Sequence, residues 1–324
     1  MRIAVLSDAV LPTPYPAGHG LGKVASIVAE HLLQRGHDVT LYAREGSRFS
    51  GALVMPPSAN GYEGEWILAQ AAMRDHRAQA YDAFLDNGHL HCIAEMFPHM
   101  PVVNAFHDAY QEYARCPVLM SSGQKALMPA TFEGARVIHN ALDPAEYPFQ
   151  ELPDKQDYAL FLGAISDIKQ PLLAIEACAR MGLKLVMAGL ALTGPLPISA
   201  HSNVQLVGPV YGDHKLKLLQ GARVLLQLGV GESFGLTTLE ANLCGTPAVC
   251  WPAGGSLDII KYGLNGVFVI PGGDKVQAVC DAIERAWFMD RRGVRMAVEN
   301  RFSIDTQVTA TENALIDVVC GRWW

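Results

Sequence analysis

The sequence lacks several patterns that would reveal its chemistry at once. Its seven cysteines include no Cys-x-x-Cys pair, which argues against a disulfide framework or a zinc knuckle and favours a reducing compartment, the cytoplasm. It has no Asp-x-Asp pair, and the stretch from Gly18 to Lys23 fits neither a P-loop nor Gly-x-Gly-x-x-Gly. No run approaches the ~18 apolar residues of a membrane-spanning helix, and the apolar run at the N-terminus is too short for a signal peptide.

The chain also has little excess charge of either sign. Its 25 Lys and Arg stand against 32 Asp and Glu, so the net charge is -7. Neither half is basic, with 10 basic and 14 acidic residues in 1–144 and 15 and 18 in the rest. A mildly acidic chain is poorly suited to grip a phosphate backbone. We therefore expect a small molecule or a glycan as partner rather than a nucleic acid, while peripheral contact with a membrane stays open.

The N-terminal half has the pattern of a doubly wound α/β domain. An apolar run at 3–7 predicts a buried strand, a Pro- and Gly-rich loop follows, and residues 24–33 have helical spacing. Gly36 ends that helix, and 39–42 predicts the second strand. The pattern continues more loosely, with further strands expected at 83–85, 102–106 and 137–138.

A second α/β domain is expected after a Pro- and acid-rich linker at 147–157. Its expected strands are 158–162, 185–188, 204–207, 224–228, 248–251 and 267–270, and its expected helices are 172–181, 236–243 and 276–287. We thus predict an N-terminal domain over 1–145 and a C-terminal domain over 146–303, facing a central cleft where ligands bind. A last helix within 304–324 is expected to cross back to the N-terminal domain.

The stretch from Gly231 to Pro247 is the most informative. It follows a buried strand and opens a helix, so the amides from Phe234 to Thr238 would lie at the positive end of the helix dipole, which suits a diphosphate. Glu232 and Glu240 bracket these amides, and a carboxylate accepts hydrogen bonds from paired sugar hydroxyls well. For either Glu taken alone, a capped, half-buried helix with an ordinary acidic residue is the better interpretation.

The whole stretch resembles a known family. Glu232 and Glu240, with seven residues between them, are similar to the E-x7-E motif of retaining glycosyltransferases of the GT-B fold, family 4, or glycosyl transferases group 1. Phe161 to Gln170 resembles the phosphate-binding segment of that family. Further similar segments are Arg35 to Val39, Asn140 to Asp143, and Gly254 to Asp258. The resemblance is strong in 158–270 and thinner in 44–136.

The resemblance implies a role for individual residues. Glu232 would hold hydroxyls of the donor sugar, Glu240 the ribose, and Lys169 the diphosphate, while His107 would lie near the reacting centre. Donor contacts are also implied for Gly18, Gly20, Val210, Tyr211, Ser233, Phe234, Gly235, Leu236 and Thr237. No metal site and no cofactor beyond a UDP- or GDP-sugar is implied. A plain turn at Gly18 to Gly20 and a structural role for His107 are the alternatives.

The expected reaction is metal-independent transfer of a sugar to an acceptor hydroxyl with retention at the anomeric carbon. Ala164 stands where the family has an arginine, and Lys215 and Arg223 are candidate replacements. The alternatives are a nucleotide-sugar epimerase or phosphorylase of the same fold, or a degenerate nucleotide-sugar binder. Arg291 to Arg295 reads as a solvated helix end.

Overall fold

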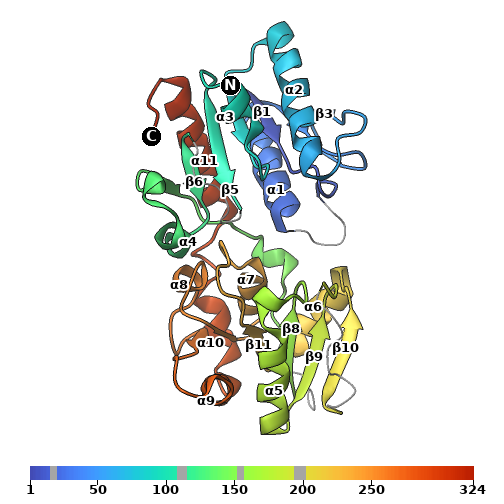
Figure 1. Cartoon of the computed structure of the whole chain (residues 1–324), viewed down its shortest axis with the longest axis vertical. Coiled ribbons are helices and arrows are strands. Elements are labelled where there is room, and N and C mark those ends of the chain that lie inside the picture. The colour runs from blue at the N-terminus through green and yellow to red at the C-terminus, as the bar shows by residue number, and fades with distance from the viewer. Residues whose placement is uncertain (15–19, 108–114, 152–156, 193–201) are drawn as a thin grey trace. The chain divides into compact units, whose positions relative to one another are not determined.

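The computed structural model describes residues 1–14, 20–107, 115–151, 157–192 and 202–324, which form two compact units (Figure 1). Unit 1 comprises Met1–Ala141 together with Ser303–Trp324, and unit 2 comprises Leu142–Phe302. The chain therefore leaves unit 1, builds all of unit 2, and returns to unit 1 for its last helix. Gly18 lies outside the described residues.

Unit 1 contains a parallel sheet of seven described strands in the order 3-2-1-4-5-6-7. In that order they are β3 (Ala52–Val54), β2 (Asp38–Tyr42), β1 (Arg2–Leu6), β4 (Ala83–Asp86), β5 (Val102–Phe106), β6 (Pro117–Leu119) and β7 (Arg136–Val137). The helices are α1 (Gly20–Gln34), α2 (Gly61–Gln79), α3 (Cys92–Met96), α4 (Ser122–Leu127) and α11 (Ile304–Val319), with a 3-10 turn at Ala130–Phe132. Strands predicted at the start of the chain are confirmed, because continuous apolar runs are typical of strands buried on both faces.

Helices cover both faces of this sheet. Ala4, Leu6 and Phe84 pack against α2 and α3 on one face. Leu85 and Val103 alternate with them and point to the other face, which α1 and α11 cover. The return of α11 thus completes the core of a unit that the first part of the chain builds.

Polar contacts fix the returning segment within unit 1. Arg35 donates to the Glu312 carboxylate at 2.7 Å, and His37 contacts the other oxygen of Glu312 at 2.8 Å. At the end of the chain, the Trp324 indole donates to the Pro117 carbonyl at 2.9 Å, and Arg136 lies 3.6 Å above its ring. These contacts come from the middle and the end of the segment and add to its buried apolar face.

Unit 2 contains a parallel sheet of six described strands in the order 10-9-8-11-12-13. In that order they are β10 (Val204–Gly208), β9 (Lys184–Ala188), β8 (Tyr158–Leu162), β11 (Val224–Gln227), β12 (Ala248–Cys250) and β13 (Gly266–Phe268). The helices are α5 (Pro171–Met181), α6 (Gly212–Gly221), α7 (Leu236–Leu243), α8 (Ser256–Ile259), α9 (Lys275–Trp287) and α10 (Arg291–Met296), with 3-10 turns at Pro144–Glu146 and Asp167–Lys169. The main core lies between the sheet and the pair α5 and α9.

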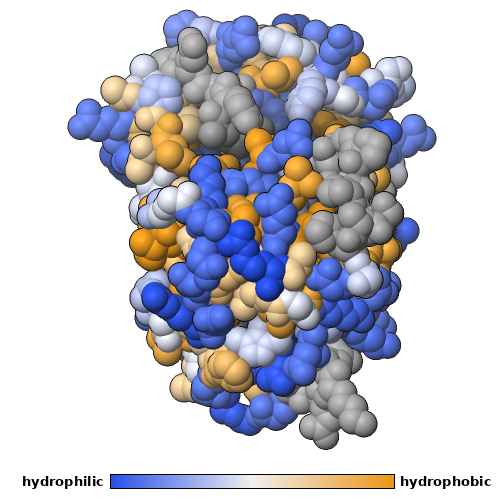
Figure 2. Space-filling view, turned by 60° about the horizontal axis from the view of Figure 1, so that its bottom comes forward, coloured by the Kyte–Doolittle hydropathy of each residue, from blue (hydrophilic) through white to orange (hydrophobic). Residues whose placement is uncertain are grey.

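The face of the molecule in Figure 2 and the cysteine thiols are of an ordinary kind. On the face in Figure 2, hydrophobic residues form several separate groups between hydrophilic ones. Among the helices of the described segments, none combines the length and apolar character needed to cross a membrane. Six of the seven cysteines are buried as reduced thiols, as expected of small hydrophobic residues, and Cys320 alone is exposed.

If α11 completes the core of unit 1, a cavity on its buried face should loosen that unit selectively. Leu315 is fully buried, so Leu315→Ala should lower stability by about 2–5 kcal/mol. Hydrogen exchange should accelerate in β4 and β5, while β8 and β11 keep their protection. Ile316→Ala, on the half-exposed side of the same helix, is the control and should cost far less. Equal loss of protection in both units would contradict this division.

Candidate active site

The loop between β11 and α7 presents a helix N-terminus at the carboxyl edge of the unit 2 sheet. Gly235 adopts a left-handed conformation at the N-cap, and α7 then runs from Leu236 to Leu243 as predicted. Among the described residues, the amides of Gly235, Leu236 and Thr237 bond no carbonyl, whereas the Thr238 amide closes a turn onto the Gly235 carbonyl at 2.9 Å. Three of the five amides that the sequence predicts to face an anion therefore remain available. The Thr238 amide does not remain available, which corrects that prediction.

A pair of glycines holds this loop in shape. The Gly255 amide donates to the Glu232 carbonyl at 2.7 Å. A Cβ on Gly254 would lie 2.3 Å from the Glu232 oxygen, and one on Gly255 would lie 2.0 Å from the Phe234 oxygen. Both contacts are with backbone, which cannot swing aside as a side chain can, so the segment from Glu232 to Phe234 rests directly on the glycines.

Glu232 is held from two sides. The Gln227 side chain, at the end of β11, donates to its Oε1 at 2.7 Å. Lys169 forms an ion pair with the same oxygen. Gly229 leaves room for this lysine, since a Cβ there would lie 2.9 Å from the Lys169 Cδ. Two residues that the sequence predicts to bind the donor thus meet in the structure.

Lys169 occupies an unusual electrostatic position. It ends the 3-10 turn Asp167–Lys169, and its side chain is 28% exposed. Burial lowers the pKa of Lys169 to about 8, while the Glu232 carboxylate beside it favours the charged ammonium. The ammonium is thus poorly hydrated, and a group that brings more negative charge would be attracted strongly.

Glu240 lies one turn inside α7 and is almost fully buried, with 4% of its surface exposed. The Tyr147 hydroxyl donates to its Oε1 at 2.8 Å, and the Lys215 Nζ donates to the same atom at 2.6 Å. Tyr147 is itself buried, so the predicted linker is wrong at its first residue, which belongs to the core of unit 2. Sequence reasoning missed this residue as a partner of Glu240.

Val210 and Tyr211, which the resemblance implies as donor contacts, precede α6. Val210 is buried and Tyr211 is 45% exposed at the N-cap of the helix, so Lys215 lies one turn further along. The candidate cations that would replace the family arginine at Ala164 are both engaged. Lys215 pairs with Glu240, and Arg223 donates to Asp157 at 2.8 Å.

The basic cluster of α10 is not the solvated helix end that the sequence suggested. Arg291 donates to the carbonyls of Ala222, Gln220 and Cys244 at 2.8, 2.7 and 3.2 Å. Arg295 donates to the Leu243 carbonyl at 2.6 Å. These carbonyls terminate α6 and α7, where cations are favoured by the helix dipole. Arg292 does follow the expectation, since it is exposed beside Glu151.

The remaining predicted residues lie in unit 1. Gly20 is the first residue of α1. His107 follows β5, and its Nε2 lies 3.2 Å from the Asn87 Oδ1. Nearby in the sequence of unit 1, the His89 Nδ1 lies 2.8 Å from a carboxylate oxygen of the buried Glu65. The role of His107 near a reacting centre stays a prediction.

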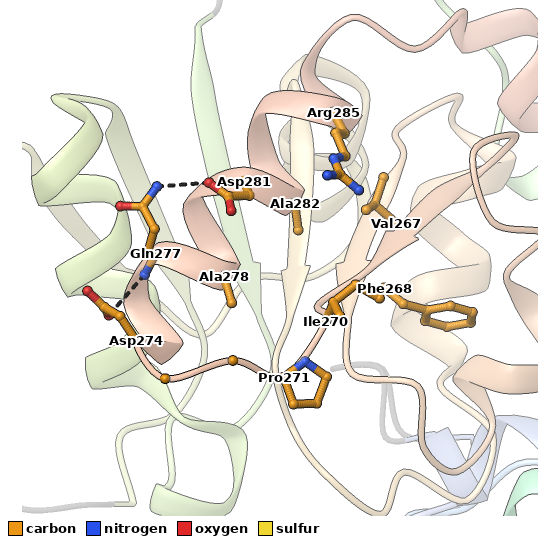
Figure 3. A pocket seen from close by; sticks show the side chains of 12 residues that line it. Val267, Phe268, Ile270, Pro271, Asp274, Gln277, Ala278, Asp281, Ala282 and Arg285 are labelled. Atoms are coloured by element: carbon orange, nitrogen blue, oxygen red, sulfur yellow. Dashed lines mark hydrogen bonds between the residues drawn. The ribbon is translucent and has the colours of Figure 1, made fainter.

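Unit 2 contains a small and a larger cavity among its described residues. A small one of about 10 Å³ lies beneath the α7 loop and is lined by Gln227, Glu232, Thr238 and Ser256 among others, which is room for about one water molecule. The other has about 390 Å³ and lies between β13 and the start of α9. In Figure 3, Gln277 of this second cavity bonds both Asp274 and Asp281. Both carboxylates thus accept a hydrogen bond from Gln277, and none of the predicted site residues lines this cavity.

The fold of the chain is shared with solved glycosyltransferases. AviGT4, a glycosyltransferase involved in avilamycin A biosynthesis, is 22% identical with a TM-score of 0.77, and the match covers 100% of this chain and 99% of that one. HepE of Anabaena, solved in complex with UDP-glucose, is 18% identical with a TM-score of 0.70, and the match covers 98% and 100%. The two Rossmann-like units therefore have the GT-B fold.

The family model matches a segment that lies within unit 2. Residues 144–296 match the family model of glycosyl transferases group 1. An uncharacterized glycosyltransferase of Methanocaldococcus jannaschii is 27% identical over 59% of this chain and 60% of its own length. The D-inositol 3-phosphate glycosyltransferase of Mycobacterium avium is 31% identical over 41% of this chain and 34% of its own length. The matches span less than two thirds of the length of these relatives. The chain carries a glycosyltransferase domain of group 1 at residues 144–296.

The glycine pair generates a prediction about the α7 loop. Gly255→Ala should displace the Phe234 backbone, destabilise the protein by about 1–3 kcal/mol through overpacking, and weaken binding of UDP or GDP at least tenfold. Gly272→Ala is the control, because nothing lies within 4 Å of its Cβ position. Thermal unfolding and calorimetric titration measure both effects. Unchanged nucleotide affinity in Gly255→Ala would show that the loop does not depend on this fit.

Proposed function

We propose that the protein is a retaining glycosyltransferase that moves a sugar from a nucleoside-diphosphate sugar to an acceptor hydroxyl. The observation that carries this proposal is the meeting of Lys169 and Glu232 beside the open amides of α7. A cation and a helix N-terminus suit a diphosphate, and a carboxylate beside them suits sugar hydroxyls. The match of residues 144–296 to the group 1 family supports the same assignment.

In this mechanism the bond between the anomeric carbon and the diphosphate oxygen breaks as negative charge develops on the leaving diphosphate. Lys169 and the amides of Gly235, Leu236 and Thr237 stabilise that charge. Glu232 orients the sugar, and Glu240 holds the ribose. The acceptor oxygen bonds the anomeric carbon on the face that the diphosphate leaves, and its proton passes to the leaving phosphate, so that no protein base is required.

The donor and acceptor classes are proposed from relatives and from charge. HepE was solved with UDP-glucose, which supports a UDP-sugar donor, and GDP-sugars are the second choice. The Mycobacterium avium relative is named for an inositol phosphate, so polyols and glycans are the acceptors to try first. We propose that the reaction is metal-independent, because the sequence has no Asp-x-Asp pair and Lys169 supplies positive charge. The buried reduced thiols suit a cytoplasmic location.

The proposal is tested by turnover. UDP-, GDP- and ADP-sugars are screened by thermal shift, and release of nucleoside diphosphate is then followed with a panel of polyols and glycans. Lys169→Ala and Glu232→Gln should each lower kcat/KM by about 100-fold or more, as loss of a group acting on developing charge does. Lys184→Ala, an exposed lysine of the same unit, is the control.

Four outcomes separate the possibilities. Activity should persist in EDTA, and the product should keep the anomeric configuration of the donor. Binding without turnover would identify a degenerate binder, which the Ala164 position would explain. Near-normal rates in Lys169→Ala would contradict the proposed site.

The buried position of Lys169 also predicts a pH dependence. The pKa of about 8 means that the ammonium loses its proton as the pH rises through 8, so affinity for UDP or GDP should fall by up to about tenfold per pH unit above it. Lys169→Arg stays charged over this range and should flatten the profile, while the titration of the nucleotide is common to both proteins. Glu232→Gln removes the carboxylate that favours the ammonium, so the midpoint should move to lower pH. Parallel profiles for wild type and Lys169→Arg would contradict the prediction.

A further inference from the structure

The carboxylate of Glu240 is gripped by two donors from different parts of unit 2. Tyr147 follows the 3-10 turn Pro144–Glu146, and Lys215 lies in the first turn of α6. Their donor atoms lie 2.8 and 2.6 Å from the same atom, Oε1. Side-chain exposure is only 6% for Glu240 and 19% for Lys215, so this is a largely desolvated charge pair.

The two donors leave the carboxylate with one oxygen for a ligand. A carboxylate oxygen has two lone pairs, and Tyr147 and Lys215 use both of those on Oε1. Within the described parts of the chain, Oε2 accepts no hydrogen bond. Burial and the neighbouring Glu240 raise the pKa of Tyr147 above its ordinary value, so its hydroxyl remains a donor.

Tyr147 is itself fixed in place. Arg295 of α10 donates one nitrogen to both the Tyr147 carbonyl and the Leu243 carbonyl, at 2.5 and 2.6 Å. The same guanidinium reaches the Pro144 carbonyl at 3.3 Å. The segment that carries Tyr147 is thereby tied to the C-terminus of the helix that carries Glu240. Arg295 thus fixes the backbone from which the phenol extends to Glu240.

We propose that Lys215 and Tyr147 are positioning residues that aim the free oxygen of Glu240 at the ribose hydroxyls, and so make the site selective for ribonucleotides over deoxynucleotides. The proposal rests on the proposed function, in which Glu240 holds the ribose. A ribose donates a hydroxyl hydrogen bond to a charged acceptor, and a ribose without that hydroxyl leaves the acceptor unpaired. A carboxylate that is not held in one orientation discriminates less, because water or a rotated side chain can take the place of the hydroxyl.

The test compares affinities for UDP and for 2′,3′-dideoxy-UDP by calorimetry, with the GDP and ADP pairs in parallel. Wild type should prefer the ribonucleotide by about 10- to 100-fold. Tyr147→Phe removes one donor and keeps the ring, and Lys215→Met removes the other. Each should reduce the preference to about threefold or less, whereas Lys215→Arg should keep most of it. Lys217→Met, an exposed lysine of the same helix, should behave as wild type.

The ratio of affinities distinguishes positioning from a merely structural role. Variants that weaken both ligands equally, or that leave the ratio unchanged, would overturn the inference while nucleotide binding supports the proposed function. Absence of binding by every nucleoside diphosphate to the wild type would overturn the proposed function itself. In Glu240→Gln, adding Tyr147→Phe should cause no further loss of preference, because both act through one carboxylate. Tyr147→Phe alone decides the matter if Lys215→Met does not fold.

Discussion

The site in unit 2 depends on a contact between two stretches of backbone. Gly254 and Gly255 lie against the segment from Glu232 to Phe234 so closely that neither can carry a Cβ. This contact sets where the chain turns into α7, and hence where the Glu232 side chain and the three open amides lie. The ion pair with Lys169 and the bond from Gln227 act on a carboxylate whose backbone is already in place. The positions of the side chains that would bind a ligand therefore depend on the close packing of the two glycines against this backbone.

A second constraint acts at the opposite ends of the helices. Arg291 and Arg295 of α10 bind the terminal carbonyls of α6 and α7. Burial lowers the pKa of Arg291 from its ordinary value, yet an arginine keeps its charge in proteins, so the dipole of each helix meets a permanent cation. The helices that present Lys215 and Glu240 are thus anchored at one end, and their other ends remain open. Anchoring of this kind favours a site that is formed before any ligand arrives.

Much of this arrangement could be predicted from the sequence, because it is local. Continuous apolar runs predicted β1, β2, β8, β9 and β11, and the spacing of Glu232 and Glu240 placed one carboxylate before α7 and one inside it. The 19-residue α2 escaped prediction, since its apolar face is mostly alanine and its stretch begins with Gly61. Tyr147 was read as linker because its partner Glu240 is 93 residues away. Sequence spacing does not reveal which distant segments share a core, and Gln227 was missed for a similar reason, as one polar residue at the end of an apolar strand.

The return of α11 to unit 1 has a consequence for the order in which the chain matures. During synthesis, Leu142–Phe302 leave the ribosome as a complete unit while the unit begun earlier still lacks Ser303–Trp324. Until that segment emerges, α11 cannot pack against the apolar side of β4 and β5. The part of unit 1 that is made before unit 2 therefore reaches its final packing only after unit 2 has been synthesised, and until then it exposes the hydrophobic surface that α11 later covers.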